Sequence, residues 1–144
     1  MYTDFAPPAN LLDLFTIRHD NQIMGLEILA IALGLCTFSE QLRGRRVLVW
    51  SDNTGSEASV KKGVAKSWDH SCIVHSVWLK AARIQADLFV QRVPTLENIA
   101  DLPAREEYAL LRAIGAVHYV PVLDQPFWRP GAWESLSLMH ARKR

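Results

Sequence analysis

The run from Val47 to Asn53 (VLVWSDN) constrains the fold more than any other stretch of this chain. Four consecutive apolar residues, two of them β-branched, predict a strand covered on both faces, as in a parallel or mixed α/β sheet. Asp52 follows at the carboxyl end of this strand, where open α/β sheets bind ligands, and a helix pattern starts at Thr54. Two interpretations therefore stay open. Asp52 takes part in metal or phosphate chemistry, or Asp52 or Asn53 simply caps the next helix.

The remaining periodicities predict an α/β domain with a C-terminal segment of different character. Helices are expected at about 7–17, 22–42, 54–62, 67–85 and 103–114, and a second strand at 88–93. Gly44 and Gly63 are placed to end the second and third of these helices. Beyond Gly115 the chain is rich in proline and aromatic residues. We therefore expect a domain over 1–116 and an extension or linker over 117–144.

Composition places the chain among globular domains and leaves its partners open. The length of 144 residues suits one domain with a real core, and 22% charged residues argue against disorder. Cys36 and Cys72 lack metal-site spacing and are expected to be buried thiols of an intracellular protein, cytoplasmic or nuclear. No apolar run is long enough for a membrane span, and no signal peptide is evident, so no membrane partner is expected. A net charge of +1 does not identify a partner, although bunched basic residues, Lys61 and Lys62 among them, could contact phosphates.

Two further acids bear on the role of Asp52. Glu27 is the only charged residue between Ile23 and Cys36, and a lone carboxylate there is costly to bury unless it is paired or binds a cation. The alternative is a glutamate near a helix start that reaches solvent or favours the helix dipole. Asp101 precedes Pro103 and could be an ordinary N-cap.

The order of strands and helices nevertheless predicts that Glu27, Asp52 and Asp101 converge at one edge of the sheet. Carboxylate clusters are what hard divalent cations require. Two such ions about 4 Å apart would activate water and stabilise the leaving oxygen of a phosphodiester.

At these three acids the chain resembles a known family. Glu27 in MGLEILAIALGL, Asp52 in VLVWSDN and Asp101 in RVPTLENIADLPAR resemble the second, third and fourth acids of the ribonuclease H (RNase H) domain of retroelement reverse transcriptases. The resemblance covers about Gln22 to Arg105. It implies an RNase H-like fold, dependence on Mg²⁺ or Mn²⁺, and cleavage of the RNA strand of an RNA–DNA hybrid.

The chain departs from this family before Glu27. The family's first acid lies on an opening strand that a hairpin follows, whereas only 26 residues precede Glu27 here and residues 7–20 read as a helix. Asp4 resembles that first acid superficially but lies where the third strand should be. The expectation is an α/β, RNase H-like fold, N-terminally truncated, with a mixed sheet flanked by helices.

The predicted site consists of catalytic and metal-binding acids together with residues that contact nucleic acid. The first group is Glu27, Asp52 and Asp101 with Mg²⁺ or Mn²⁺, and the second is Asn53, Lys61, Lys62 and Arg105. A surface ion pair of Arg105 with Glu106 or Glu107 is the alternative for that residue. His70 and His75 are expected to be ordinary helix residues, and Trp68 and Trp78 to be core residues rather than base-stacking platforms.

Two classes of function are compatible with this pattern. The first is a nuclease domain that hydrolyses the RNA strand of hybrids in the intact parent protein, beside a polymerase domain of the same polyprotein. The second is a degenerate, non-catalytic RNase H-like scaffold that packs against a polymerase or another partner. An exonuclease or integrase of the same fold also stays open, because a fold does not determine a function.

Overall fold

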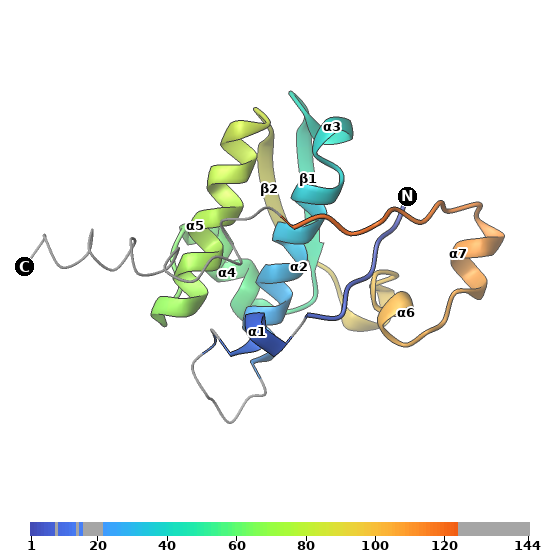
Figure 1. Cartoon of the computed structure of the whole chain (residues 1–144), viewed down its shortest axis with the longest axis horizontal. Coiled ribbons are helices and arrows are strands. Elements are labelled where there is room, and N and C mark those ends of the chain that lie inside the picture. The colour runs from blue at the N-terminus through green and yellow to red at the C-terminus, as the bar shows by residue number, and fades with distance from the viewer. Residues whose placement is uncertain (8, 14, 16–21, 124–144) are drawn as a thin grey trace, which may run out of the picture.

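The computed structural model of the chain describes residues 1–7, 9–13, 15 and 22–123. Helices α2 and α5 lie side by side over a small parallel sheet (Figure 1). The elements are α1 Ala9–Leu12, α2 Ile23–Thr37, α3 Ser39–Leu42, β1 Arg46–Ser51, α4 Thr54–Lys62, α5 Trp68–Arg83, β2 Asp87–Arg92, a 3-10 turn Thr95–Glu97, α6 Asp101–Ala104 and α7 Ala109–Ala113. Within these ranges no helix has the length and apolarity needed to cross a membrane.

The two strands pair in parallel, as the chain order predicts. Val47 lies opposite Leu88 and Val49 opposite Val90, and α4 and α5 form the connection between the strands. A parallel pair requires such a crossover, because its strands run in the same direction. The two strands expected from residue 47 onward and at 88–93 are therefore both present, and they are neighbours in one sheet.

The described residues cover one face of this sheet, so the prediction of a strand buried on both faces is wrong for this part of the chain. Leu48, Trp50 and Phe89 point outward and are 48%, 54% and 55% exposed. The buried side chains of the strands instead join the core under α2 and α5. A run of apolar residues shows that a strand is apolar, but it does not show how many layers cover it.

The predicted mixed sheet is also not found, because the described residues form a sheet of two parallel strands only. A mixed sheet would need antiparallel strands from an opening hairpin. Before α2 the described chain forms the short helix α1 and a single bridge between Tyr2 and His118. The helix expected at 7–17 appears as α1, and most of its second half lies outside the described residues.

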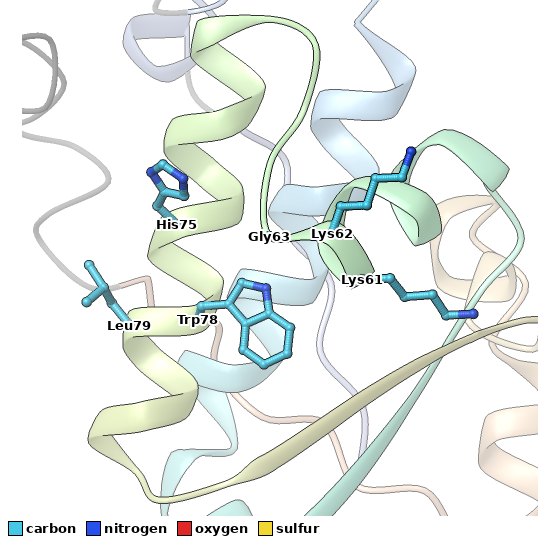
Figure 2. Close-up of a pocket in the computed structure, with 6 residues that line it drawn as sticks. All are labelled: Lys61, Lys62, Gly63, His75, Trp78 and Leu79. Atoms are coloured by element: carbon cyan, nitrogen blue, oxygen red, sulfur yellow. The ribbon is translucent and has the colours of Figure 1, made fainter. Parts of the chain in front are cut away.

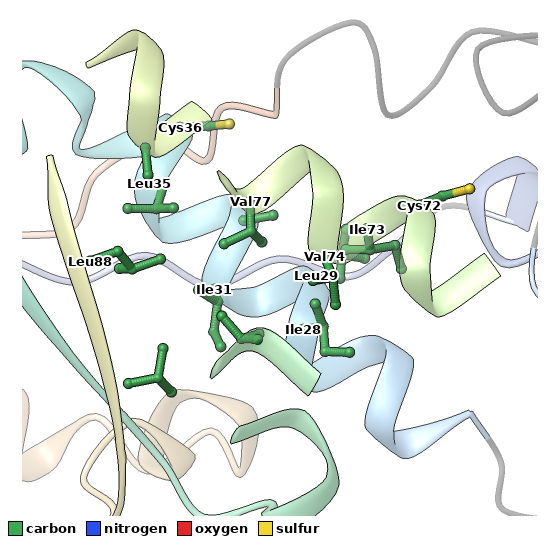
Figure 3. Close-up of a cluster of buried hydrophobic side chains, with 14 of the residues drawn as sticks. Ile28, Leu29, Ile31, Leu35, Cys36, Cys72, Ile73, Val74, Val77 and Leu88 are labelled. Carbon is green, nitrogen blue, oxygen red and sulfur yellow. The ribbon is translucent and has the colours of Figure 1, made fainter. Parts of the chain in front are cut away.

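The core lies between α2, α5 and the inner face of the sheet (Figure 3). Ile28, Ile73, Val74 and Val77 are among its most deeply buried side chains, each contributing about 1.5–3 kcal/mol by burial. Gly25 is required for close packing, since a Cβ there would lie 2.6 Å from the Phe15 ring and 2.7 Å from His70 Nε2.

The ends of the helices follow local signals in some places and tertiary contacts in others. The helix expected at 22–42 is interrupted at Phe38, so that α2 and α3 are separate, and Gly44 follows with a φ of +67°. The single helix expected at 103–114 is likewise wrong. Glu106 adopts a φ of +60° and the Glu107 N–H donates to the Leu102 carbonyl, an arrangement that ends α6 and separates it from α7.

Residues 117–123 return across the molecule and contact α2. Val122 N donates to Thr37 Oγ1 at 2.9 Å, and the Tyr119 ring packs edge-on against Phe38 with centroids 5.5 Å apart. The predicted boundary between 116 and 117 stays a prediction, and residues 124–144 lie outside the described chain.

Candidate active site

The carboxyl end of β1 leads directly into α4, and Asn53 caps this helix. Asn53 Oδ1 accepts a hydrogen bond from Ser56 N at 2.9 Å, and the buried hydroxyls of Ser51 and Ser56 lie 2.7 Å apart. Since Asn53 satisfies the helix end, Asp52 does not act as the cap. The strand therefore presents a carboxylate that local structure does not use.

Glu27, Asp52 and Asp101 lie close enough for their charges to interact. Burial raises the pKa of Glu27, and the negative charges of Asp52 and Asp101 raise it further. The pKa of Asp101 is also raised, first by burial and then by Asp52, while Arg105 lowers it. A second carboxylate disfavours ionisation of the first, so these shifts place α2, the end of β1 and α6 around one acidic site.

A pocket of about 370 Å³, here called the acid pocket, lies at this site and is lined by two of the three acids, Glu27 and Asp101. Its polar lining includes Glu27, Ser51, Asn98 and Asp101. The remaining lining is mostly apolar and comes from α2, Phe38, α3, β1 and Ala100: Ala30, Ile31, Gly34, Leu35, Phe38, Leu42, Val47, Val49, Trp50 and Ala100. An apolar cleft with a few converging acids is the ordinary form of a ligand or catalytic site.

Asp101 is held from two sides at this pocket. Asn98 Nδ2 donates to Oδ1 at 3.0 Å, and Arg105 Nη2 approaches Oδ2 at 3.5 Å. Asp101 is the first residue of α6 and makes no side-chain cap, so the N-cap interpretation is wrong. Arg105 pairs with Asp101, which differs from the alternative of an ion pair with Glu106 or Glu107.

Sequence reasoning missed Asn98 as a site residue. The available signal was its place three residues before Asp101, the spacing at which the two side chains now meet. Glu27, for its part, is half-buried in the fifth position of α2 and lines the pocket, which disfavours the interpretation of a glutamate that reaches open solvent.

The donor set of the acid pocket suits a hard cation, although its acids are not gathered into a closed site. The lining carboxylates of Glu27 and Asp101 and the amide of Asn98 are oxygen donors of the type that Mg²⁺ and Mn²⁺ prefer, and Asp52 lies near enough for its charge to raise the pKa of both acids. Among residues 1–7, 9–13, 15 and 22–123, however, no three His, Cys, Asp or Glu side chains are close enough together to hold a metal ion. The acids therefore share an electrostatic environment without forming a complete coordination shell.

Asp4 belongs to a different cluster. Its Oδ2 accepts a hydrogen bond from the Tyr108 hydroxyl at 3.0 Å, and its Oδ1 lies 2.8 Å from His118 Nε2. Asp4 is not among the charges that raise the pKa of Glu27 or Asp101. The possibility that Asp4 replaces the family's first acid therefore has no support from the geometry.

The predicted nucleic-acid contacts lie in several places. Asn53 and Arg105 are next to the acids, whereas Lys61 and Lys62 lie at the far end of α4. Lys61 Nζ is bonded to Glu57 Oε1 at 2.6 Å. The prediction that Trp68 and Trp78 are core residues is wrong, since they are 42% and 36% exposed.

Other predicted residues are buried in helices. His70 packs in the core beside Phe15, and both cysteines are buried in the described structure. Burial, with a smaller contribution from Asp69, raises the pKa of Cys72 to about 11, so this thiol stays protonated at neutral pH. These residues therefore form part of the packing around α2 and α5.

Comparison of the chain with known protein families, with curated proteins and with solved structures gives no match in any of the three.

Proposed function

We propose that this chain is an RNase H-like domain of a retroelement reverse transcriptase, and that its intact parent hydrolyses the RNA strand of RNA–DNA hybrids. One observation carries the proposal: Glu27, Asp52 and Asp101 come from three distant segments, and beyond the effect of burial the charge of Asp52 raises the pKa of both Glu27 and Asp101 at the carboxyl end of β1. Folding places like charges together at a cost, and a bound cation would remove that cost. An intracellular location, where such hybrids form, accompanies the proposal.

In this proposal Glu27, Asp52 and Asp101 hold Mg²⁺ or Mn²⁺. The bound ion would supply a more acidic water and stabilise the charge that develops on the phosphodiester. Asn98 and Arg105 act as positioning residues, because they hold the two oxygens of Asp101 in place. Arg105 and the Asn53 amide nitrogen lie near enough to the acids to meet a substrate phosphate.

The proposed site needs a further carboxylate, and the open edge of β1 is where one can be added. In the described chain no strand pairs with the edge of β1 opposite β2. The apolar lining of the acid pocket runs past Val47 and Val49 toward Ile31 and Gly34. A strand added to this edge would place its inward side chains in that apolar space and its end near Asp52.

The alternative is a non-catalytic scaffold that packs against a polymerase domain of the same polyprotein or another partner. Two observations favour it: the acids do not form a closed metal shell in the described residues, and Asp4 is bound to Tyr108 and His118. In that case the exposed outer face of the sheet would be covered by the partner.

A cleavage assay on RNA–DNA hybrids with Mg²⁺ or Mn²⁺ distinguishes the two. We expect the 144-residue chain to cleave poorly, and a chain extended upstream by a hairpin that carries an acid to cleave efficiently. Asp52→Asn in the extended chain should abolish cleavage, since each 1.36 kcal/mol of lost transition-state stabilisation is about tenfold in rate.

Asp87→Asn is the matched control, because Asp87 is an exposed acid at the other end of the sheet. Cleavage that survives Asp52→Asn would refute the assignment of the acids. An extended chain that folds and binds hybrid without cleaving it would favour the scaffold.

A further inference from the structure

A second pocket lies between the end of α4 and the middle of α5 and is here called the α4–α5 pocket. Its volume is about 560 Å³, within the range of about 300–1,000 Å³ that is usual for small-ligand sites. It shares no lining residue with the acid pocket. Its lining residues are Lys61, Lys62, Gly63, His75, Trp78 and Leu79 (Figure 2).

Trp78 provides a fixed aromatic surface in this pocket. Figure 2 shows its ring projecting from α5 toward α4. The indole Nε1 donates to the Val60 carbonyl at 2.9 Å, which ties the ring to the last turn of α4. Because the side chain is still partly exposed, the ring can offer a face to a ligand without first being ordered.

The charges around this ring are positive. None of the six lining residues is acidic, and Lys61 is paired with Glu57. Lys62 is exposed and makes no ion pair within the described chain, and His75 lies one turn before Trp78 on α5. Lysines in a last helical turn also offset the helix dipole, but that role does not account for a partly exposed, hydrogen-bonded tryptophan beside them.

The entrance of the pocket is open at Gly63. This residue ends α4 with a φ of +74°, and a Cβ at its position would meet nothing within 4 Å. Leu79 adds an exposed apolar surface on α5. Trp78 supplies a flat aromatic ring, Leu79 an apolar surface and Lys62 a positive charge. Together they fit a ligand that is both aromatic and anionic.

We propose that the α4–α5 pocket binds a nucleotide unit, with the base stacked on Trp78 and the phosphate held by Lys62. The site is separate from the acids and does not require them to bind a metal. The same chemistry is offered by a free nucleotide and by one unit of a single strand. Stacking on an aromatic ring tolerates any base, so the site carries little sequence preference.

Binding of adenosine monophosphate, adenosine, inorganic phosphate and a fluorescent single-stranded oligoadenylate to the full chain tests the proposal. Adenosine monophosphate should bind more tightly than adenosine or phosphate alone. Trp78→Leu should weaken it roughly 5- to 100-fold, the range for loss of one stacked base, while Trp78→Phe keeps a ring and retains part of the affinity. Lys62→Gln should weaken it and reduce the salt dependence of strand binding by about one phosphate contact.

Lys66→Gln is the matched control for charge, since Lys66 is exposed and lies outside the lining. Asp52→Asn should leave binding unchanged, which keeps this proposal separate from the function of the acids. If the oligoadenylate strand binds more tightly than adenosine monophosphate, the ligand of the pocket is a nucleic acid strand. If the two bind equally, the ligand is a free nucleotide. Unchanged affinity in Trp78→Leu, with its thermal unfolding showing a folded protein, would overturn the proposal.

Discussion

Glu27, Asp52 and Asp101 form one group, and Asp4 with Tyr108 and His118 forms a second. The two groups differ in whether the neighbours of a carboxylate repel its charge or stabilise it. At the acid pocket the charges of Glu27, Asp52 and Asp101 lie close enough to interact, and Arg105 partly offsets the effect on Asp101. In the second group the Asp4 carboxylate accepts a hydrogen bond from the Tyr108 hydroxyl and contacts His118 Nε2, so these neighbours stabilise its charge. The first arrangement costs stability until something binds, whereas the second joins two segments of the chain. A carboxylate is therefore a candidate for function when its neighbours repel it.

The largest expected difference between the groups is their response to a divalent cation. Mg²⁺ should stabilise the wild-type chain by about 2.7 kcal/mol at roughly a hundredfold excess over Kd, because only the folded state gathers the acids. Glu27→Gln and Asp52→Asn should lose most of this gain, while Asp4→Asn keeps it. Thermal unfolding with and without Mg²⁺ measures the effect. Equal shifts in all three variants would mean that the acid pocket does not select the cation.

In the second group, Asp4→Ala should loosen the attachment of the N-terminal segment to Tyr108 and His118. The substitution removes the two polar contacts that Asp4 makes with Tyr108 and His118 and leaves the ring contacts of Tyr2 with both residues. Exchange of the Tyr2 and Tyr119 amides, which bond to Val117 and Tyr2, should accelerate about tenfold. Hydrogen exchange followed by NMR gives the rates, with the α5 amides as internal reference.

The hydroxyl of Tyr108 supplies an independent readout for the same group. Its pKa is raised, mainly by the hydrogen bond to Asp4. Asp4→Asn should therefore move the ionisation of this phenol to lower pH in an ultraviolet titration. A Tyr108 titration that does not change would show that the contact with Asp4 is not maintained in solution.

A smaller effect is expected from the pH dependence of Glu27. Burial and the charges of Asp52 and Asp101 raise its pKa above the ordinary value of 4.5, so the metal-free folded state binds this proton more tightly than the unfolded chain does. The resulting stability is fully present below the ordinary pKa and is lost as the pH rises through the raised value.

Glu27→Gln should accordingly be more stable than the wild type at neutral pH without metal, by about 0.2–1 kcal/mol. The difference should disappear at pH below 4. Urea unfolding at several pH values measures the difference in free energy of unfolding. A Glu27→Gln variant that is less stable than the wild type at neutral pH would contradict the repulsion of Glu27 by the other two acids.

The smallest effect is expected for Arg105→Ala. Its contact with Asp101 is 3.5 Å long and partly exposed, so solvent screening leaves it a few tenths of a kcal/mol at most. Loss of the cation should raise the pKa of Asp101 further, because Arg105 is the charge that lowers it. NMR titration of the Asp101 carboxyl measures this, and Arg112→Ala on α7 is a comparable substitution away from the acids.

Local signals predicted the unit around β1 and α4 almost to the residue. The apolar run and the left-handed Gly63 each act within a few residues and are found where expected, and of the two capping candidates Asn53 rather than Asp52 caps the helix. The same local reasoning was wrong for Trp78, which was expected in the core. Large aromatic residues are compatible with a core, a surface or an interface, and only the neighbours of α5 decide among them.

The sequence by itself determined the local elements, their order and the presence of three acids in segments that resemble one family. These properties depend on residues a few positions apart, where periodicity, caps and left-handed turns act. Only the tertiary structure decided that the described residues cover one face of the sheet. It also decided that Asp101 lies with Glu27 and Asp52, while Asp4 lies with Tyr108. The physical reason is that charges interact strongly only over a few ångströms in space. The packing of α2, β1 and α6 therefore decides which acids interact with one another, and the position of Tyr108 decides that Asp4 accepts a hydrogen bond instead.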